Sequence, residues 1–515
     1  MDDGIASGRT IELKGSYIVS GPISQRAVRR SGHLHIHCLG DVEIRVTPGA
    51  QPFSVLLACH TATPNHSSIS GGRLLIDLAG RCASGLLLRH DGGDGGTVRW
   101  GPVEVRQAMN HDADDVNENQ AILIHGRYQQ VELVATRVSG VDRSNATAGA
   151  CKGISVSGIV GQVTLRNPVV EHVRCGRASA DADGISVFAQ PSPAGPYAWR
   201  RGRVQILEPV VRDCQGRSIK IQVSDALIDR PCIQRQAIAT IGVPDIDFQI
   251  GNGELRDARF DYRRRPDGSS PLHAAFYPIS VQQQCTDRPM LARISGGVLR
   301  SELPLPRLVY LTVGAAAMDG TTVLEGFRCE PAQPGGPVLA FRRAVLEFSG
   351  AQAGRSAGLT DVVVRGVQVA LAQAPLLGYT EADEAAGQRV AFQLVDNQNL
   401  AAGQGSAPLM GPVSGGPMPR WRRLELHGNR GLADLQSRLR LALDSVVAGS
   451  SLRVDLATCR LDTPPPDLPD RGIARLQVWA ANSGLPGRWV SVELVGAADH
   501  YRARRDALGR WTVDS

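Results

Sequence analysis

Three stretches of the chain, VELVATRVSGV (131–141), VTLRNPVVEHV (163–173) and VQILEPVVRDC (204–214), align with one another without a gap. Apolar and polar residues alternate in each stretch, β-branched residues are frequent, and Gly, Asn, Asp and Pro separate the segments. This pattern is typical of short, half-buried β-strands. The aligned apolar positions are Val131, Val163 and Val204; Leu133, Leu165 and Ile206; Val138, Val170 and Val211; and Val141, Val173 and Cys214.

A second set of period-two strands accompanies this repeat. Its aligned pairs are Ile122 and Ile124, Ile154 and Val156, Ile185 and Val187, and Ile219 and Ile221. The repeat advances 32 residues from Val131 to Val163 and 41 residues from Val163 to Val204, which predicts an insertion in the second interval.

Repeats of roughly 20 to 50 residues are typical of solenoids, propellers and arrays. The strand period excludes helical repeats, and the four-strand signatures of propeller blades are missing. We therefore predict an all-β fold, a right-handed parallel β-helix whose coils stack their apolar side chains on one another.

The same strand texture predicts a β-helix over residues 1–430, with the first coils as its N-terminal cap. Residues 431–448 have helical periodicity, with five apolar residues on one face, and a Pro-rich linker follows to residue 470. Residues 471–515, which contain Trp479, Trp489 and Trp511, are interpreted as an antiparallel β module for assembly or binding. The apolar face of the helix comprises Leu432, Leu435, Leu439, Leu443 and Val446.

The composition is that of a folded, water-soluble protein, with 42% hydrophobic and 21% charged residues among 515. No apolar stretch approaches the roughly 18 residues of a membrane span, so we expect no membrane insertion. The formal charge of +6 is dispersed and almost entirely arginine, which does not favour nucleic acid as a partner. The start, MDDGIASGRT, lacks the basic and apolar regions of an export signal. We therefore expect synthesis in the cytoplasm without a signal peptide.

The ten cysteines form no CxxC pair and have no histidines at zinc-ligand spacing, so we expect buried free thiols. The acidic turn HDADD (111–115) lacks the glycine of an EF-hand loop and is interpreted as solvated. No metal and no cofactor are predicted.

Stacked coils would bring polar residues into columns. The residues two places before the aligned isoleucines are Lys152, Asp183 and Arg217, which would place one carboxylate between two cations. Such a position is expected to lower the pKa of the carboxyl. A neighbouring column would contain Ser155, Ser186 and Lys220, with Lys220 close to Asp183.

A third column contains Asp142, Arg174 and Gln215, with His172 and Asp213 beside it. The insertion FAQPSPAGPYAWRRGR (188–203) leaves the coil soon after Asp183 and carries Tyr197 and Trp199. Aromatic rings on such a loop provide flat platforms for sugar faces, or they pack against the flank of the coil and cover it. The sequence leaves both interpretations open.

DADGISV (181–187) and GRSIKIQ (216–222) resemble the Asp-Gly and Arg-Ile-Lys elements of the pectin-lyase-like β-helix superfamily, particularly of polygalacturonase-type glycoside hydrolases. The double-Asp and His-Gly motifs of those enzymes are missing between the two elements, and one extra residue separates Arg217 from Lys220. The opening GRTIELKGSYIVSGPI (8–23) resembles the β-helix entry of bacteriophage tailspikes. This resemblance implies a homotrimer in the virion tail, in contact with other phage tail proteins.

These observations predict a bacteriophage tailspike or tail-tip protein that binds a bacterial surface polysaccharide. Depolymerisation of that polysaccharide, a purely structural or adhesive tail component, and a free bacterial hydrolase or lyase stay open as alternatives. Hydrolysis requires two carboxyl groups about 5 to 9 Å apart. Elimination requires a base and cations, for which Lys220, Arg217 and His172 are candidates. The candidate catalytic residues are Asp181, Asp183, Asp213, Arg217 and Lys220, and the candidate substrate-binding residues are Lys152, His172, Arg174, Tyr197 and Trp199.

Overall fold

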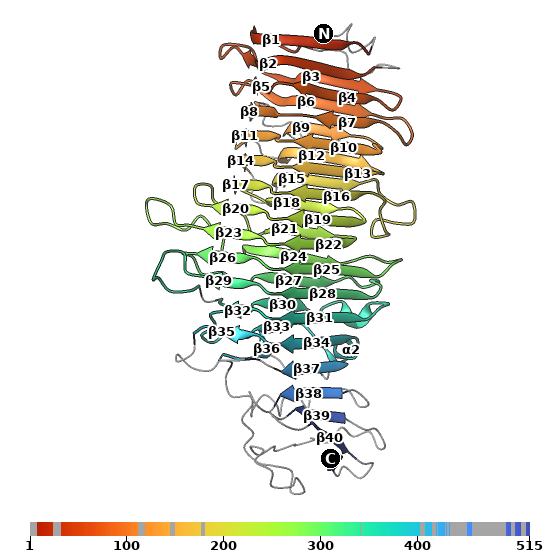
Figure 1. The fold of residues 1–515 in the computed structure, drawn as a ribbon, viewed down its shortest axis with the longest axis vertical. Helices are drawn as coiled ribbons and strands as arrows, with labels where there is room; N and C mark the ends of the chain where they lie inside the picture. The colour runs from red at the N-terminus through yellow and green to blue at the C-terminus, as the bar shows by residue number, and fades with distance from the viewer. Residues whose placement is uncertain are drawn as a thin grey trace. The chain divides into compact units, whose positions relative to one another are not determined.

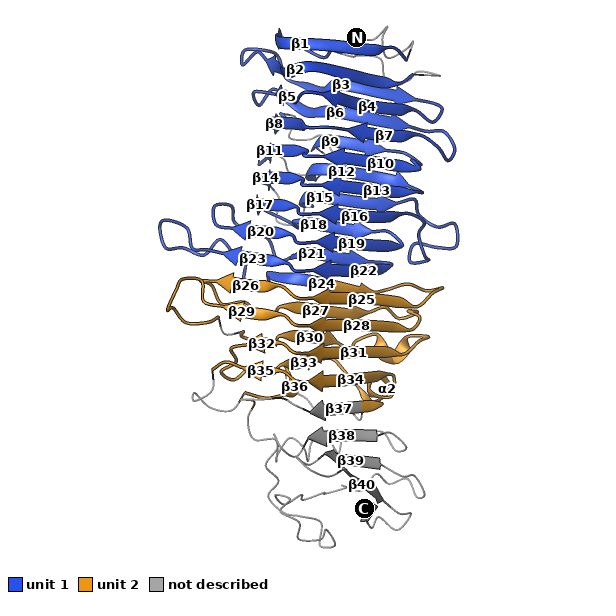
Figure 2. Ribbon diagram, viewed as in Figure 1, with its two compact units in different colours: residues 1–280 blue, residues 281–515 orange. Residues whose placement is uncertain are grey.

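The computed structural model divides into two compact units, residues 1–280 and 281–515 (Figure 2). Each unit is built from short parallel strands that follow one another in successive coils (Figure 1). The residues described are 8–23, 32–111, 119–144, 150–176, 181–339, 341–401, 407–414, 419, 421–427, 429, 432, 451–455, 491–495, 500–505 and 511–514. The predicted all-β, parallel β-helix fold is confirmed; its right-handedness stays a prediction.

Each coil of unit 1 contributes one strand to each of three faces. The coils begin with β1 (Thr10–Val19) and β2 (Leu34–Val46), and β2 is long enough to pair with strands of two faces. The first face contains β4 (His66–Gly71), β7 (Thr97–Trp100), β10 (Gln130–Val134), β13 (Gln162–Arg166), β16 (Arg203–Leu207), β19 (Asp225–Asp229) and β22 (Asn252–Arg256).

The other two faces of unit 1 follow the same order. The second face contains β5 (Leu74–Asp77), β8 (Val103–Met109), β11 (Arg137–Arg143), β14 (Val169–Cys175), β17 (Val210–Cys214), β20 (Cys232–Arg235) and β23 (Arg259–Tyr262). The third face contains β3 (Phe53–Thr61), β6 (Cys82–His90), β9 (Asn119–His125), β12 (Cys151–Ile159), β15 (Ala182–Ala189), β18 (Ile219–Gln222) and β21 (Pro244–Gln249).

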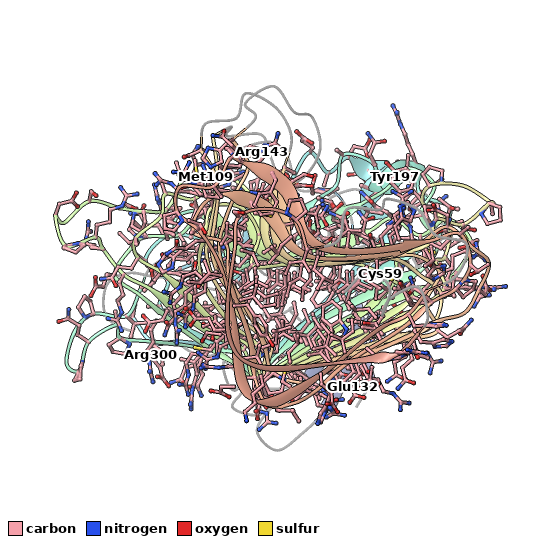
Figure 3. All side chains as sticks on the ribbon, turned by 90° about the horizontal axis from the view of Figure 1, so that it is seen from above. Cys59, Met109, Glu132, Arg143, Tyr197 and Arg300 are labelled. Carbon is pink, nitrogen blue, oxygen red and sulfur yellow. The ribbon has the colours of Figure 1, made fainter. Side chains whose placement is uncertain are left out.

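The register between coils confirms the alignment made from the repeats. Val131 pairs with Val163, and Val163 pairs with Val204, on the first face. Ile154 pairs with Ile185 on the third face. These aligned residues are buried, because alternate side chains of a strand point to opposite sides and the inward set packs on the coils above and below. In the view along the coils, Cys59 points inward and Glu132 outward (Figure 3).

The number of residues per coil varies while the register is kept. From Val163 to its partner Val204 the chain advances 41 residues, but from Val204 to its partner Ala226 it advances only 22. The extra residues lie in loops outside the paired strands. The predicted insertion is the segment between β15 and β16.

Left-handed residues occupy equivalent places in successive coils. Ala135, Asn167 and Glu208 have φ values of 51°, 51° and 52° and turn the chain between the first and second faces. On the second face, His172 and Asp213 have φ values of 59° and 50°. The residues on either side of them are paired, Glu171 with Arg212 and Val173 with Cys214. His172 and Asp213 therefore occupy the same place in successive coils, where the left-handed backbone interrupts the regular strand.

Unit 2 repeats the coiled arrangement. Strand β24 (Tyr277–Gln283) contains the division between the units. One face of unit 2 comprises β25 (Met290–Ser295), β28 (Gly320–Glu325), β31 (Thr360–Arg365), β34 (Val390–Val395), β37 (Arg423–His427), β38 (Ser451–Asp455) and β39 (Ser491–Val495). Another comprises β26 (Val298–Ser301), β29 (Arg328–Glu330), β32 (Gln368–Val369) and β35 (Gln398–Asn399), and a third comprises β27 (Val309–Val313), β30 (Leu346–Ser349), β33 (Leu377–Thr380) and β36 (Met410–Pro412).

The end of unit 2 contains antiparallel pairs. Strand β39 pairs with β40 (His500–Arg505), and β40 pairs with β41 (Trp511–Asp514). Two short helical turns, η1 (Ala353–Arg355) and α2 (Glu384–Gly387), also belong to unit 2. The helix predicted for residues 431–448, apart from residue 432, lies outside the described residues, as do Trp479 and Trp489. Within the predicted linker to residue 470, residues 451–455 form strand β38, which pairs in parallel with β37 and β39, and the other linker residues from 456 on lie outside the described residues.

The described cysteines are all free thiols, and eight of these nine are buried, which agrees with the expectation of core thiols. Within the described part of the chain no helix has the length and apolarity that a membrane crossing requires.

Candidate functional site

Charged residues gather on the outer side of the third face of unit 1. The strands β12, β15, β18 and β21 alternate here between apolar residues, which point into the coil, and polar residues, which point outward. Lys152 pairs with Asp183 in the neighbouring strand, and Lys220 pairs with Asp247. Asp181 and Arg217 come shortly before β15 and β18, at the same edge of the face.

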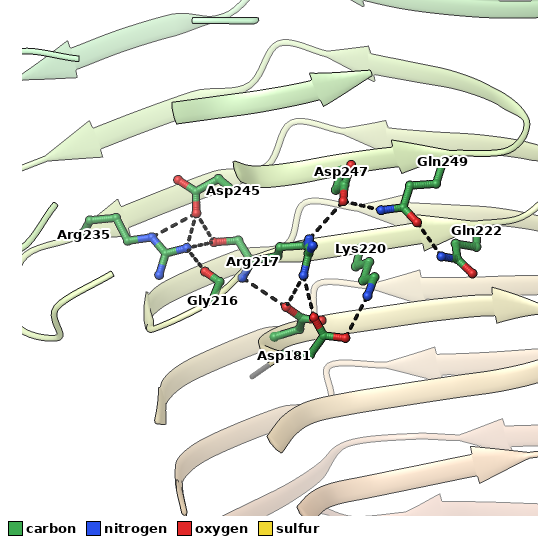
Figure 4. A network of polar contacts seen from close by, with 11 residues as sticks. Asp181, Gly216, Arg217, Lys220, Gln222, Arg235, Asp245, Asp247 and Gln249 are labelled. Atoms are coloured by element: carbon green, nitrogen blue, oxygen red, sulfur yellow. Dashed lines mark hydrogen bonds and ion pairs between the residues drawn. The ribbon is translucent and has the colours of Figure 1, made fainter. Parts of the chain in front are cut away.

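Arg217 lies at the centre of this cluster and contacts three carboxylates (Figure 4). Its Nη1 donates to Oδ1 of Asp181 at 2.7 Å and lies 3.6 Å from Oδ1 of Asp183. Its Nε donates to Oδ2 of Asp247 at 3.0 Å. The backbone N–H of Arg217 donates to Asp183 Oδ1 at 3.1 Å, so both the side chain and the main chain of this residue are oriented by carboxylates.

Lys220 is the second cation of the cluster. Its Nζ donates to Oδ2 of Asp181 at 2.8 Å, so it contacts Asp181 directly rather than Asp183. The Nζ atoms of Lys152 and Lys220 lie 5.4 and 5.5 Å from the ring centroid of Phe188. This distance is typical of cation–π contacts, which hold both ammonium groups on the outer side of the sheet.

The expected lowering of the Asp183 pKa is wrong. The side chain of Asp183 has no solvent-exposed surface, and its Oδ2 has no hydrogen-bond partner among the described residues. Burial and the negative charge of Asp181 raise the pKa of Asp183 to about 6, although Arg217, Lys220 and Lys152 act in the opposite direction. Burial exceeds the effect of the cations because desolvation disfavours the charged form.

The pKa of Asp181 is shifted in the opposite direction, below its ordinary value. Burial alone would raise its pKa, but the hydrogen bonds and positive charges of Lys220 and Arg217 lower it below the ordinary value. Its side chain is 35% exposed, against 14% for Arg217 and 12% for Lys220. Asp181 is therefore the ionised carboxylate of the pair that is accessible to solvent. Carboxyl pairs that take separate acid and base roles show such opposite pKa shifts.

A buried polar cluster lies behind the site. Arg235 and Asp245 have no exposed side-chain surface, and Nε of Arg235 donates to Asp245 Oδ1 at 2.9 Å. Ser218 and Tyr262 each donate a hydroxyl to Asp245, both at 2.6 Å. Because Ser218 follows Arg217 and Asp245 precedes Asp247 by two residues, this cluster holds both segments that supply the outer site (Figure 4).

His172, Arg174 and Asp213 lie elsewhere, on the second face of unit 1. His172 and Arg174 are exposed, and Arg174 pairs with Asp142 in the neighbouring strand. Asp213 accepts the backbone N–H groups of Gln236 and Ala237 at 2.7 and 2.8 Å through Oδ1. The left-handed backbone explains the presence of His and Asp here, since both residues adopt this conformation more readily than most.

The loop between β15 and β16 contains the two aromatic candidates. Tyr197 is 49% exposed (Figure 3), and Trp199 is partly buried. The guanidinium of Arg200 donates through Nη1 to Gln222 Oε1 at 2.9 Å, and Arg201 Nη1 lies 3.5 Å from Asp94. The loop therefore contacts the same face that contains Lys220 and Asp247.

Sequence reasoning missed Asp247 and the residues around it. Extension of the repeat alignment by one coil would have found Asp247, because Ile246 pairs with Ile219 and the segment PDIDFQ (244–249) places an aspartate on each side of it. No sequence pattern indicates Arg235 in the same way, because its contact with Asp245 depends on the turn between two faces. The missed residues are Phe188, Ser218, Gln222, Arg235, Asp245, Asp247, Gln249 and Tyr262.

Among the residues that the structure describes, no group of three or more His, Cys, Asp or Glu side chains is arranged to hold a metal ion. Of the acidic turn at 111–115, residues 112–115 lie outside the described residues. Comparison of the chain with protein-family models, with curated proteins and with solved structures finds no match.

Proposed function

We propose that the protein is a bacteriophage tailspike or tail-tip protein that binds a bacterial surface polysaccharide and hydrolyses it at the cluster around Asp181. One observation carries the hydrolytic part of the proposal: Asp181 and Asp183 share Arg217 Nη1, yet their pKa values are shifted in opposite directions. Glycoside hydrolysis uses such a pair, in which one carboxyl group holds a proton while the other is ionised.

Asp181 is the group that meets the glycan in this proposal. It is the more exposed of the two carboxyl groups and is kept ionised by Lys220 and Arg217, which suits a base or a nucleophile. Asp183 lies behind it with a pKa of about 6 and holds a proton in part of the molecules near neutral pH. Tyr197 on the neighbouring loop offers an exposed ring for a sugar face.

Elimination is less well supported by the same contacts. A lyase base has to be unprotonated when it removes a proton from the sugar. Lys220 donates to Asp181 and Arg217 donates to both Asp181 and Asp247, so the two cations are engaged as donors. His172 lies on the second face, away from the strands that hold the cluster.

A second candidate is a tail component that binds a glycan and cleaves nothing. It is favoured by the complete burial of Asp183 and Asp247, which leaves Asp181 as the accessible carboxyl group of the three. As part of either proposal, the protein assembles as a homotrimer in the virion tail with other tail proteins, as the tailspike resemblance of residues 8–23 implies.

The test uses purified full-length protein and surface polysaccharides from candidate host bacteria. Binding is measured by sedimentation with the polysaccharide, and cleavage by new reducing ends and by the ultraviolet absorbance of unsaturated uronates. The variants are Asp181→Asn and Asp183→Asn, with Asp267→Asn as control because Asp267 lies in an exposed turn after β23, where its Oδ1 accepts the backbone N–H of Ser269. The molar mass in solution tests the trimer.

Reducing ends that disappear in both site variants, but not in the control, would support hydrolysis at this cluster. Absorbance of unsaturated uronates would replace hydrolysis by elimination. Binding without either product would favour the second candidate. Failure to bind any bacterial glycan would overturn both.

A further inference from the structure

A chain of polar contacts runs along the outer side of the third face, from the aromatic loop to the carboxylates. Arg200 Nη1 donates to Gln222 Oε1 at 2.9 Å, and Gln222 Nε2 donates to Gln249 Oε1. Gln249 Nε2 donates to Asp247 Oδ2 at 2.5 Å, and the same oxygen accepts from Arg217 Nε. Figure 4 shows the part of this chain from Gln222 to Asp181.

The two ends of the chain fix the direction of every amide within it. A guanidinium can only donate, so Gln222 must present its oxygen to Arg200 and its NH₂ group to Gln249. Oδ2 of Asp247 already accepts from Arg217 Nε, so Gln249 must turn its NH₂ group, and not its oxygen, toward this atom. A flip of either amide would place two donors or two acceptors against each other, and the chain therefore has one favourable arrangement.

Gln249 also donates a hydrogen bond to the buried carboxyl group of Asp247. The side chain of Asp247 has no exposed surface, and a buried carboxylate requires donors in place of water. Its Oδ2 receives Arg217 Nε on one side and Gln249 Nε2 on the other. With Asp247 held in this way, the far end of the Arg217 guanidinium is directed at Asp181 and Asp183.

We propose that Gln222 and Gln249 are positioning residues of the site: they hold Asp247, and through it Arg217, beside Asp181 and Asp183, and they tie the loop 190–202 to the same network. The proposal rests on the proposed function in so far as that function assigns Asp181 and Asp183 to catalysis. The ionisation of Asp183 and the attachment of the loop can, however, be measured without any glycan.

The first experiment follows the proton of Asp183 by pH-difference infrared spectroscopy, with Asp183→Asn identifying its carboxyl band. In Gln249→Leu, Asp247 loses one donor and holds Arg217 less firmly, so less positive charge faces Asp183 and its titration should move to higher pH. Gln205→Leu is the matched control, because Gln205 is a partly buried, outward glutamine on β16 of the first face. Gln249→Met replaces Gln249→Leu if the latter does not fold, as judged by circular dichroism.

The second experiment measures trypsin cleavage after Arg200 and Arg201, identified by mass spectrometry of the peptides. Gln222→Leu removes the contact of Arg200 with β18 and leaves its contact with Pro196 O inside the loop, so cleavage in the loop should become several-fold faster, while Gln205→Leu should leave it unchanged. Gln222→Leu should also move the Asp183 titration less than Gln249→Leu does, since the contact between Gln249 and Asp247 remains.

An Asp183 titration that is the same in wild type and in folded Gln249→Leu would overturn the positioning role. Unchanged loop cleavage in Gln222→Leu would overturn the tie to the loop. If both effects are found but the wild-type protein cleaves no glycan, the proposed hydrolysis fails and the positioning of Arg217 stands. If the wild type cleaves a glycan and neither effect is found, the hydrolysis stands and the positioning fails.

Discussion

Arg235 and Asp245 form an ion pair without any solvent-exposed side-chain surface, with Nε of Arg235 2.9 Å from Oδ1 of Asp245. A charge buried in this way depends on its partner, because removal of one member leaves the other without compensation. The pair also connects the segments of Ser218 and Tyr262, which belong to different coils.

We predict that Arg235→Met lowers the free energy of unfolding by about 3–5 kcal/mol, the usual effect of breaking a buried ion pair. The double variant Arg235→Met, Asp245→Leu should be less destabilised than the single one, because it buries no unpaired charge. Urea unfolding followed by circular dichroism measures both. Arg230→Met is the control, since Arg230 is 59% exposed in its pair with Glu208, where water screens the attraction and the ion pair adds little to stability. Equal losses in Arg235→Met and Arg230→Met would contradict the prediction.

The raised pKa of Asp183 predicts a specific dependence of stability on pH. Between pH 3.8, the ordinary pKa of an aspartate, and the pKa of about 6 in the folded protein, the folded protein binds a proton at Asp183 that the unfolded chain does not. The contribution of Asp183 to stability therefore falls as the pH rises through this window, by on the order of 2–3 kcal/mol in total. Asp183→Asn should remove this decline. The measurement is the pH dependence of the free energy of unfolding for the two proteins, and parallel curves would refute the assignment.

Lys220→Met should raise the pKa of Asp181. The lowered pKa of Asp181 depends first on the hydrogen bond and charge of Lys220, acting against burial. Methionine keeps an apolar stem beside Phe188 but removes the charge. If Asp181 acts as a base or nucleophile, the acid limb of the pH profile of glycan cleavage should move to higher pH in this variant. A pH profile identical to that of the wild type would separate Lys220 from the ionisation of Asp181.

Asp213→Ala should lower stability by about 1–3 kcal/mol without changing glycan binding or cleavage. Alanine loses the two hydrogen bonds that the carboxylate of Asp213 accepts from the backbone N–H groups of Gln236 and Ala237, and water has to replace them at these exposed residues. It also tolerates a φ of 50° less well than aspartate does. Asp213→Asn, which keeps a side-chain oxygen and adopts left-handed backbone readily, should be close to wild type. A loss of cleavage in folded Asp213→Asn would return Asp213 to the list of catalytic candidates.

The core of the fold could be predicted because apolar periodicity carries the register. Val131, Val163 and Val204 occupy one column in the sequence and pair in the structure. The ionisation of Asp183 could not be predicted in the same way. Its position beside Lys152 was evident from the alignment, but its complete burial, which decides the sign of the pKa shift, depends on side chains from several coils.

The candidate site shows a second limit of sequence reasoning. Residue types typical of catalysis also serve the backbone, as His172 and Asp213 do at their left-handed positions. Conversely, Gln222 and Gln249 are unremarkable in the sequence, and their contacts arise only when three coils are stacked. Chemistry that depends on contacts between coils is therefore less visible in one sequence than the coil itself.

The unequal coil lengths affect how the loops of such a β-helix can change during evolution. Paired strands keep their register whether 22 or 41 residues separate them, so the length of the segment between β15 and β16 can change while the strands stay paired. Mutation can therefore exchange this loop, with Tyr197 and Trp199, while the scaffold that carries Asp181 and Arg217 is inherited unchanged. Under the proposed function, a change of ligand preference would then require new residues in one loop and no new register between the coils.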